Sequence, residues 1–271
     1  MFFLNEIIVV FQEGTAISKD KSVIHRVSAI LCLFGPERAL IGIDDIVQAL
    51  DISAASAYRY AADMVEAGLL SRLAGRYRLG MKIIELEYLI STGDPIIAAA
   101  GGLMADLARG TGGDVLLCNM YDRTLVNVAH VAAGKPIPLR YSKGLPMPLF
   151  RGSQAHVVLA FMERRRLKRL YEAALQDPAS RDDALRMGAD WAAFSRRLRQ
   201  VRKQGHYVSR GELDPGVTGI AAPVFGDGEI LGSLVIVHGR AGMAEAEEAE
   251  FAKLAMAAAR RLSDRIQGIA A

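Results

Sequence analysis

The chain has 271 residues, 51% of them hydrophobic and 23% charged, so it can bury the core of one large domain or of two smaller ones. Its formal net charge of +3 neither requires nor excludes a polyanionic partner, because a basic patch can be local. The two cysteines, Cys32 and Cys118, lie far apart, which argues against a disulfide framework and favours a reducing cytoplasm.

The chain begins with a short apolar stretch, MFFLNEIIVVF, which falls well below the roughly 20 residues that a membrane-spanning helix needs. The stretch carries Glu6 in its middle and lacks the basic region of a secretory signal. We therefore interpret residues 1–20 as an N-terminal extension. No later segment is long and uncharged enough to span a bilayer, so we expect no membrane partner.

Three helices are predicted next, over residues 22–34, 43–50 and 54–67. A tight turn at residues 51–52 separates the second helix from the third. Ser53 is placed to cap the third helix, and Gly68 is placed to end it.

Two short β-like segments follow at residues 69–73 and 76–79, joined by a turn at Ala74-Gly75. The order of helix, short helix, tight turn, helix and hairpin is typical of a winged helix-turn-helix, with the hairpin as the wing. We therefore predict a DNA-binding domain over residues 21–80. An amphipathic helix over residues 81–93 is interpreted as a linker.

The remainder of the chain alternates helices with β-rich segments. After Gly93-Asp94-Pro95, helices are predicted over residues 96–109, 153–162, 164–174, 191–204 and 244–266. Strands are predicted over residues 114–119, 124–131, 137–141, 218–225 and 229–237. Because strand pairs are joined by turns and flanked by helices, we predict that residues 94–271 form one α+β domain with a mostly antiparallel sheet.

Three sequence blocks stand in order along the chain: IDDIVQALDISAASAYRYAADMVEAGLL, the segment RYRLG at residues 76–80, and GVTGIAAPVFGDGEILGSLVIVHG at residues 216–239. They resemble the helix-turn-helix, with its Tyr-Arg pair here at Tyr58-Arg59, the wing, and the ligand-domain signature of the IclR family of bacterial transcription regulators. The resemblance covers residues 22–267. It implies a GAF-like C-terminal domain for effector binding and oligomerisation, homodimers or homotetramers on DNA, and no catalysis.

The resemblance implies that the third helix reads double-stranded operator DNA in the major groove. The N-terminal half of that helix offers Ser53, Ser56, Tyr58, Arg59 and Tyr60. An arginine can donate two hydrogen bonds to a guanine edge, whereas hydroxyl groups more often contact phosphates. The wing offers Arg72, Arg76 and Arg78 to phosphates or to the minor groove. Because residues 1–80 are not net basic, we expect modest non-specific affinity, which a dimer or tetramer would offset.

Effectors in the IclR family are mostly small organic acids or aromatic catabolites, held on one face of the sheet. By motif position, the resemblance assigns this pocket to Arg151, Gly152, Ser153, Ser209, Val217, Gly219, Ile236 and His238. Gly152 and Ser153 stand at the start of a helix, where free backbone N–H groups suit a carboxylate. Ser153 and Ser209 would orient the ligand, and Val217 and Ile236 would shape the pocket.

The same region departs from the family pattern. His156 stands where Lys is common, His238 stands where a small polar residue is frequent, and Phe150-Arg151 is unusual. These departures leave the specificity for the ligand open. Arg151 either pairs with a carboxylate or is an ordinary surface arginine.

Two other classes of function are weaker. The chain has no Walker A loop, no Gly-x-Ser-x-Gly, no His-Glu-x-x-His and no paired-cysteine site, and its five histidines show no ligand spacing, so we expect no enzyme, cofactor or metal. A GAF-like sensor that acts through protein partners, with a degenerate helix-turn-helix, remains the alternative. We predict a cytoplasmic transcription regulator whose effector shifts the dimer between DNA-binding and non-binding arrangements through the linker helix.

Overall fold

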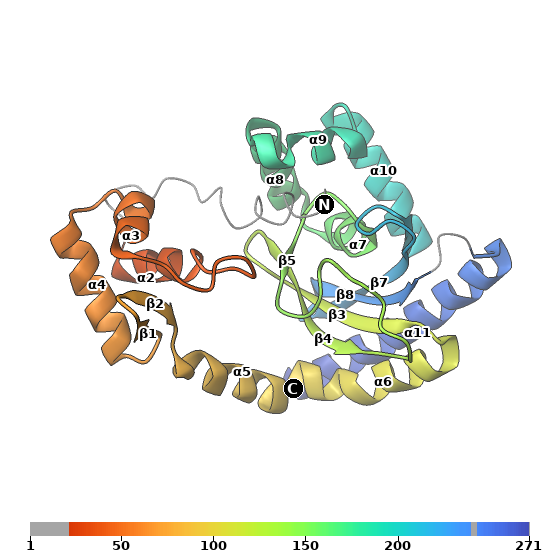
Figure 1. Ribbon diagram of the computed structural model, residues 1–271. Coiled ribbons are helices and arrows are strands. Elements are labelled where there is room, and N and C mark those ends of the chain that lie inside the picture. Colours follow the sequence, from red (N-terminus) through yellow and green to blue (C-terminus); the bar gives the residue numbers. More distant parts are fainter. Residues whose placement is uncertain (1–21, 240–242, 271) are drawn as a thin grey trace. The chain divides into compact units, whose positions relative to one another are not determined.

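The computed structural model describes residues 22–239 and 243–270 (Figure 1). The chain divides into two compact units, one ending at Thr92 and the other beginning at Gly93. The expectation for residues 1–20 lies outside the described residues. A helix-turn-helix unit followed by an α+β unit with an antiparallel sheet confirms the predicted fold class.

The first unit is a winged helix-turn-helix. Its elements are α2 (Val23–Leu31), α3 (Ile43–Leu50), α4 (Ala54–Glu66), β1 (Leu70–Leu73) and β2 (Arg76–Leu79). Asp51 adopts a left-handed conformation, with φ of 49°, and turns the chain between α3 and α4. Ser53 Oγ accepts a hydrogen bond from the Ser56 amide at 3.3 Å, and Gly68 follows the end of α4 with φ of +73°, as predicted.

A small apolar core fixes the orientation of these helices. Ile30 of α2, Ile46 of α3 and Met64 of α4 are buried in it, and each contributes roughly 1.5–3 kcal/mol through burial. Ile41 and Tyr77 exchange two backbone hydrogen bonds of 2.9 and 2.8 Å, which tie the segment before α3 to the wing. The core and the wing therefore fix the orientation of α4, and with it the direction of the helix face that is exposed to solvent.

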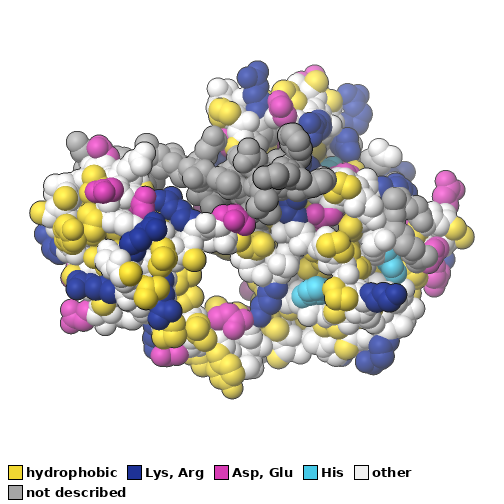
Figure 2. All heavy atoms as spheres, viewed as in Figure 1, with side chains coloured by type: hydrophobic (Ala, Val, Ile, Leu, Met, Phe, Trp, Pro, Cys, Tyr) yellow, Lys and Arg dark blue, Asp and Glu magenta, His cyan; other side chains and the backbone are white. Residues whose placement is uncertain are grey.

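Helix α5 (Met81–Gly93) has no buried residue. Six of its large apolar side chains are between 42% and 64% exposed: Met81, Ile84, Leu86, Tyr88, Leu89 and Ile90. Figure 2 shows hydrophobic side chains at the surface along the segment that Figure 1 labels α5. Apolar patches of this kind usually mark a surface that a partner covers.

The second unit is a six-stranded antiparallel sheet covered by helices on both faces (Figure 1). Its strands lie in the order β5 (Pro146–Met147), β4 (Thr124–Val131), β3 (Asp114–Tyr121), β8 (Glu229–His238), β7 (Thr218–Gly226) and β6 (Tyr207–Arg210). Helices α6 (Pro95–Thr111) and α11 (Glu245–Ala270) cover one face. Helix α7 (Ser153–Phe161) lies on the other face and is followed by α8 (Arg164–Gln176), α9 (Pro178–Met187) and α10 (Trp191–Gln204).

Alternation along the central strands separates two apolar cores. Leu117 of β3 and Ile236 of β8 pack into the core beneath α6 and α11. Leu116 of β3 and Val235 of β8 pack into the core on the α7 face. Because both faces are covered, the central strands are apolar at nearly every position.

Some elements differ from the prediction. The strand predicted over residues 137–141 is wrong, because this segment holds Pro138 and follows Pro136, and a proline cannot donate to a strand ladder. The fifth strand is instead the two-residue β5. The sequence patterns also did not predict β6 or α9.

We expect Gly232→Ala to destabilise the second unit. A Cβ at this position would lie 1.9 Å from the carbonyl oxygen of Cys118 on the neighbouring strand, so the central pair β3–β8 must separate locally. The free energy of unfolding in urea should fall by at least about 2 kcal/mol.

Gly102→Ala is the matched control, because Gly102 lies within α6 and a Cβ there would meet nothing within 4 Å. Its free energy of unfolding should stay level or rise by about 0.5–1 kcal/mol. Equal stability of the two variants would contradict the crowding at Gly232.

Candidate nucleic-acid interface and ligand pocket

Helix α4 turns one face into the core and the other towards solvent. Ala57, Ala61 and Met64 are buried at helical spacing. Tyr58 is therefore directed outwards, with 57% of its surface exposed, and Arg59 beside it is also exposed. The predicted Tyr-Arg pair lies on the open face of the second helix of the helix-turn-helix.

The two serines predicted at this face hold the start of α4. Ser53 accepts the capping hydrogen bond from the Ser56 amide and donates its own hydroxyl proton to Ser56 Oγ at 3.1 Å. Ser56 only accepts in this pair, so its hydroxyl proton remains available to a phosphate oxygen.

Tyr60, also predicted as a DNA contact, lies inside the unit and is only 5% exposed. Its hydroxyl accepts a hydrogen bond from Arg26 Nη1 at 2.8 Å. The Arg59 guanidinium lies 5.8 Å from the centre of the Tyr60 ring, within cation–π range. The tyrosine therefore positions Arg59 rather than reaching a base or a phosphate itself.

The three wing arginines are all exposed but are held differently. Arg76 donates from Nη2 to the backbone oxygen of Leu40 at 3.0 Å, so part of its guanidinium supports the wing. Arg72 and Arg78 form no hydrogen bond or ion pair with the residues that the structure describes, 22–239 and 243–270. Both remain available to a phosphate.

A pocket of about 40 Å³ lies between the sheet and the start of α7. Its polar lining is Asn127, Ser153, Gln154, Ser209 and Asp214. Its apolar lining includes Leu213, Val217, Val235 and Val237. Four predicted effector residues, Ser153, Ser209, Val217 and Gly219, are therefore brought together.

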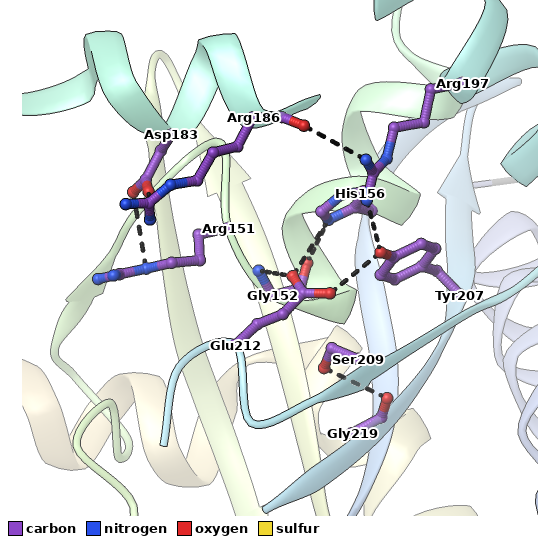
Figure 3. Close-up of polar contacts among 10 residues, drawn as sticks. All are labelled: Arg151, Gly152, His156, Asp183, Arg186, Arg197, Tyr207, Ser209, Glu212 and Gly219. Atoms are coloured by element: carbon purple, nitrogen blue, oxygen red, sulfur yellow. Dashed lines mark hydrogen bonds and ion pairs between the residues drawn. The ribbon is translucent and has the colours of Figure 1, made fainter. Parts of the chain in front are cut away.

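Gly219 allows two hydroxyl groups to approach each other in this pocket. A Cβ at Gly219 would lie 2.8 Å from Ser153 Oγ and 3.1 Å from Ser209 Oγ. The Ser209 hydroxyl has only a long contact of 3.5 Å to the Gly219 carbonyl (Figure 3). Both hydroxyls line the pocket, and the hydroxyl of Ser209 forms only this long hydrogen bond with the residues that the structure describes.

Two of the predicted effector residues face away from the pocket. Ile236 is buried in the core beneath α6 and α11, and the His238 ring stacks on Phe251 of α11 at 5.1 Å. Their neighbours Val235 and Val237 line the pocket instead. The expected assignment is off by one residue, because alternation along β8 reverses the face at each step.

Arg151 lies outside the pocket lining. Its Nε is 3.6 Å from Asp183 Oδ2 on α9, and the side chain is 25% exposed (Figure 3). The structure therefore gives this arginine a partner within the chain, which neither reading of the sequence anticipated.

The Gly152 amide, which was expected to bind a ligand carboxylate, already binds a carboxylate of the protein. Gly152, with φ of +88°, donates from its N–H to Glu212 Oε2 at 3.0 Å, at the start of α7. The other oxygen of Glu212 accepts from the Tyr207 hydroxyl at 3.0 Å, and Arg197 Nη2 donates to that hydroxyl at 3.0 Å (Figure 3). The Gly152 amide at the start of α7 is thus already occupied by the chain's own Glu212.

Sequence reasoning missed four polar groups around the pocket: Asn127, Gln154, Glu212 and Asp214. Gln154 donates to Asn127 Oδ1 at 2.6 Å, and Asn127 donates to the Tyr141 carbonyl at 2.8 Å. Burial raises the pKa of the Asp214 carboxyl, which lies 4.0 Å from Arg140 Nε. For Glu212 and Asp214, the sequence signal was their position directly before the Gly216 block.

His156, beneath the same helix start, is only 2% exposed. Its Nδ1 lies 2.9 Å from the Gly152 carbonyl, and its ring stacks on Tyr207 at 4.0 Å. The carbonyl can only accept, so Nδ1 carries the proton, and Nε2 is buried without a partner among the described residues. Burial lowers the pKa of this imidazole, while the Gly152 carbonyl and Glu212 act in the opposite direction.

Within residues 22–239 and 243–270, three or more His, Cys, Asp or Glu side chains nowhere gather to form a metal site. In that same part of the chain, every helix falls short of the length and apolarity needed to cross a membrane.

Two family models match this sequence. The model of the bacterial transcriptional regulator IclR C-terminal domain matches residues 89–264, and the IclR helix-turn-helix model matches residues 23–74. Among curated proteins, the HTH-type transcriptional regulator KdgR of Escherichia coli (strain K12) is 25% identical over 245 residues, 88% of this chain and 92% of the relative. The regulator XynR of the same organism is 26% identical over 208 residues, 74% and 79%.

Solved structures share the fold. The IclR transcriptional regulator from Alicyclobacillus acidocaldarius aligns with a TM-score of 0.72 at 19% identity, over 90% of this chain and 98% of that chain. An IclR homologue from Microbacterium hydrocarbonoxydans, solved in complex with 4-hydroxybenzoate, aligns with a TM-score of 0.70 at 20% identity, over 91% and 100%.

The lowered pKa of His156 predicts a pH-dependent stability. Since its pKa is lower in the folded state than in the unfolded state, the unfolded chain takes up this proton first as the pH falls below about 6.5. Stability is therefore retained above that pH and is lost down to the folded pKa. In urea titrations at pH 7.5, 6.5 and 5.5, wild type should lose more stability than His156→Gln, and parallel losses would refute this origin.

Proposed function

The chain belongs to the IclR family of bacterial transcription regulators, and on that premise we propose that it is a ligand-responsive regulator whose grip on operator DNA is altered by a small organic acid. The observation that carries the DNA side of the proposal is Arg59, exposed on α4 and held against the buried Tyr60 ring. A pre-positioned guanidinium loses little freedom when it meets a base edge. The KdgR and XynR relatives are transcription regulators, which supports a protein without catalytic activity, acting in the cytoplasm.

Direct readout is assigned to Arg59, which can donate two hydrogen bonds to a guanine. Tyr58 and Ser56 would contact phosphates, as would Arg72 and Arg78 from the wing. Ser53 and Tyr60 support the helix and the arginine, while Arg76 divides its donors between the wing and DNA.

A homodimer or higher oligomer is supported by α5. Its apolar side chains are exposed along the whole helix, and a second copy of the same helix would bury them. Two copies would also double the contacts to DNA, which compensates for an N-terminal unit that is not net basic.

For the effector, we propose that the carboxylate of the ligand takes the place of Glu212 at the Gly152 amide. A pocket of about 40 Å³ holds little more than two or three waters, so an organic acid must widen it. Leu213 and Asp214 line the pocket directly after Glu212, so displacement of Glu212 would move part of the wall with it. Ligand exchange and movement of this segment would then be one event.

We expect Arg59→Ala to weaken binding to the DNA upstream of the protein's own gene by roughly 10-fold or more, because a bidentate base contact is worth about 1–3 kcal/mol. Fluorescence anisotropy across a salt series, with scrambled DNA of the same length, measures the specific part. The control is Arg169→Ala, which removes an exposed arginine from α8 and should stay within about twofold. Equal affinities of wild type and Arg59→Ala would favour the rival sensor that acts through protein partners.

We expect Glu212→Gln to bind 4-hydroxybenzoate, used as a probe carboxylate, at least about fivefold more tightly than wild type. The variant replaces a charge-assisted hydrogen bond to the Gly152 amide with a neutral one, which a ligand displaces more easily. Isothermal titration calorimetry measures the ratio, and Glu229→Gln, an exposed acid at the start of β8, is the control. Unchanged or weaker binding would show that Glu212 does not occupy the ligand's position.

A further inference from the structure

A second cavity in the same unit is separate from the effector pocket. It has a volume of about 130 Å³ and lies between the end of α7, the start of α8 and one side of α10. No residue lines both cavities. The proposed function does not use this cavity, so its lining residues are considered separately.

The interior of the cavity is apolar and well supported. Met162, Leu167 and Leu198 line it and are at most 6% exposed. The Trp191 indole forms a further wall and packs against Tyr171 and Phe194 at ring distances of 5.9 and 5.8 Å. An apolar cavity of about 150 Å³ is known to accept benzene, so this volume suits a single aromatic ring.

One hydroxyl in the lining is unsatisfied. Ser195 Oγ on α10 is buried and has no hydrogen-bond partner among the described residues. A serine within a helix commonly donates to the carbonyl four residues earlier, which Ser195 does not do. Leaving such a group unpaired costs about 1–3 kcal/mol, which a polar atom of a ligand would recover.

The rim of the cavity is cationic. Arg164, Arg199 and Arg202 line it, and no acidic side chain does. Arg202 is anchored, because its Nε donates to the Ala160 carbonyl at 2.6 Å and its guanidinium lies over the Phe161 ring. Arg164 and Arg199 have no hydrogen bond or ion pair with any residue in the described ranges.

The carboxylates nearest in sequence do not neutralise this rim. Glu163 accepts hydrogen bonds from the Arg165 and Arg166 amides at 2.7 and 2.8 Å and caps α8. Asp190 accepts from the Ala193 amide at 2.7 Å and caps α10. Both are committed to helix starts, so the guanidinium groups are left to an anion from outside.

We propose that this cavity is a second ligand site, for a small aromatic carboxylate. The ring lies among Leu167, Trp191 and Leu198, and the carboxylate pairs with Arg164 and Arg199 at the rim. The Ser195 hydroxyl donates to an oxygen of the ligand. A guanidinium suits this role because its donors form a planar fork that matches a carboxylate.

Trp191 gives this site its own signal, because it is the only tryptophan in the chain. Benzoate is titrated into the full-length protein while the Trp191 emission is recorded. We expect a saturable change, with benzyl alcohol at least about fivefold weaker because it lacks the charge. An emission that changes only linearly with benzoate would overturn the proposal.

Two variants locate the binding. Ser195→Leu fills the cavity and should abolish the saturable change, and Arg199→Ala should weaken benzoate at least about fivefold without touching the core. The matched control is Arg196→Ala, which removes an exposed arginine of α10 that does not line this cavity. If Ser195→Leu does not fold, Arg199→Ala against Arg196→Ala decides, and equal affinities for these two would overturn the site.

Glu212→Gln separates this site from the effector pocket. Its Trp191 titration should match that of wild type, whatever happens to its calorimetric binding of 4-hydroxybenzoate. A Trp191 response that follows the Glu212 substitution would assign the signal to the effector pocket and would overturn a second site.

Discussion

Successive side chains of a β-strand point to opposite faces of the sheet, and in this protein helices close both faces. On β8 this sends Val235 and Val237 towards α7 and sends Ile236 and His238 towards α11. The first pair becomes a wall of the ligand pocket and the second pair becomes part of the interior. A slip of one residue would exchange the pairs, so the packing of α6 and α11 holds the register on which the pocket depends.

A carboxyl group of the chain itself, that of Glu212, lies at the start of α7. Glu212 satisfies the Gly152 amide and is itself held by Tyr207, while His156 lies buried against both. If a ligand replaces Glu212 as proposed, its free energy of binding is the difference between two carboxylates on one amide, which is smaller than for an empty site. The proposed displacement would also couple binding to a movement of the pocket wall, because Leu213 and Asp214, which follow Glu212, line the pocket.

Most of the fold could be predicted because local signals agreed with each other. The bounds of α3, α10 and β4 follow from apolar periodicity, and the turn into α4 follows from Asp51 and the Ser53 cap. Three sequence blocks identified the family. The pocket residues of β8 were assigned wrongly because Val235, Ile236 and Val237 are all apolar. A strand that is buried on both faces shows no alternation of polar and apolar residues from which the pocket face could be predicted.

The remaining errors at the two sites have their own physical reasons. The burial of Tyr60 could have been predicted from its helical spacing to Ala57 and Met64. The Arg151–Asp183 ion pair could not, because it joins α9 to the start of α7 and has no signal in the local sequence. The contact of Glu212 also could not be predicted from local sequence, because its partner Gly152 lies 60 residues earlier.

The centre of the sheet joins strands from opposite ends of the second unit. Strand β3 pairs with β8, so Asp114 meets Val237 only after nearly the whole unit has been synthesised. The first unit completes its own core from residues no later than Tyr77. Domains generally fold as units and N-terminal ones first, so we expect the helix-turn-helix unit to emerge from the ribosome folded while the second unit is still an open chain. A nascent chain or a truncation that stops before β8 is therefore expected to keep the helix-turn-helix unit and to lack the finished sheet on which an effector would act.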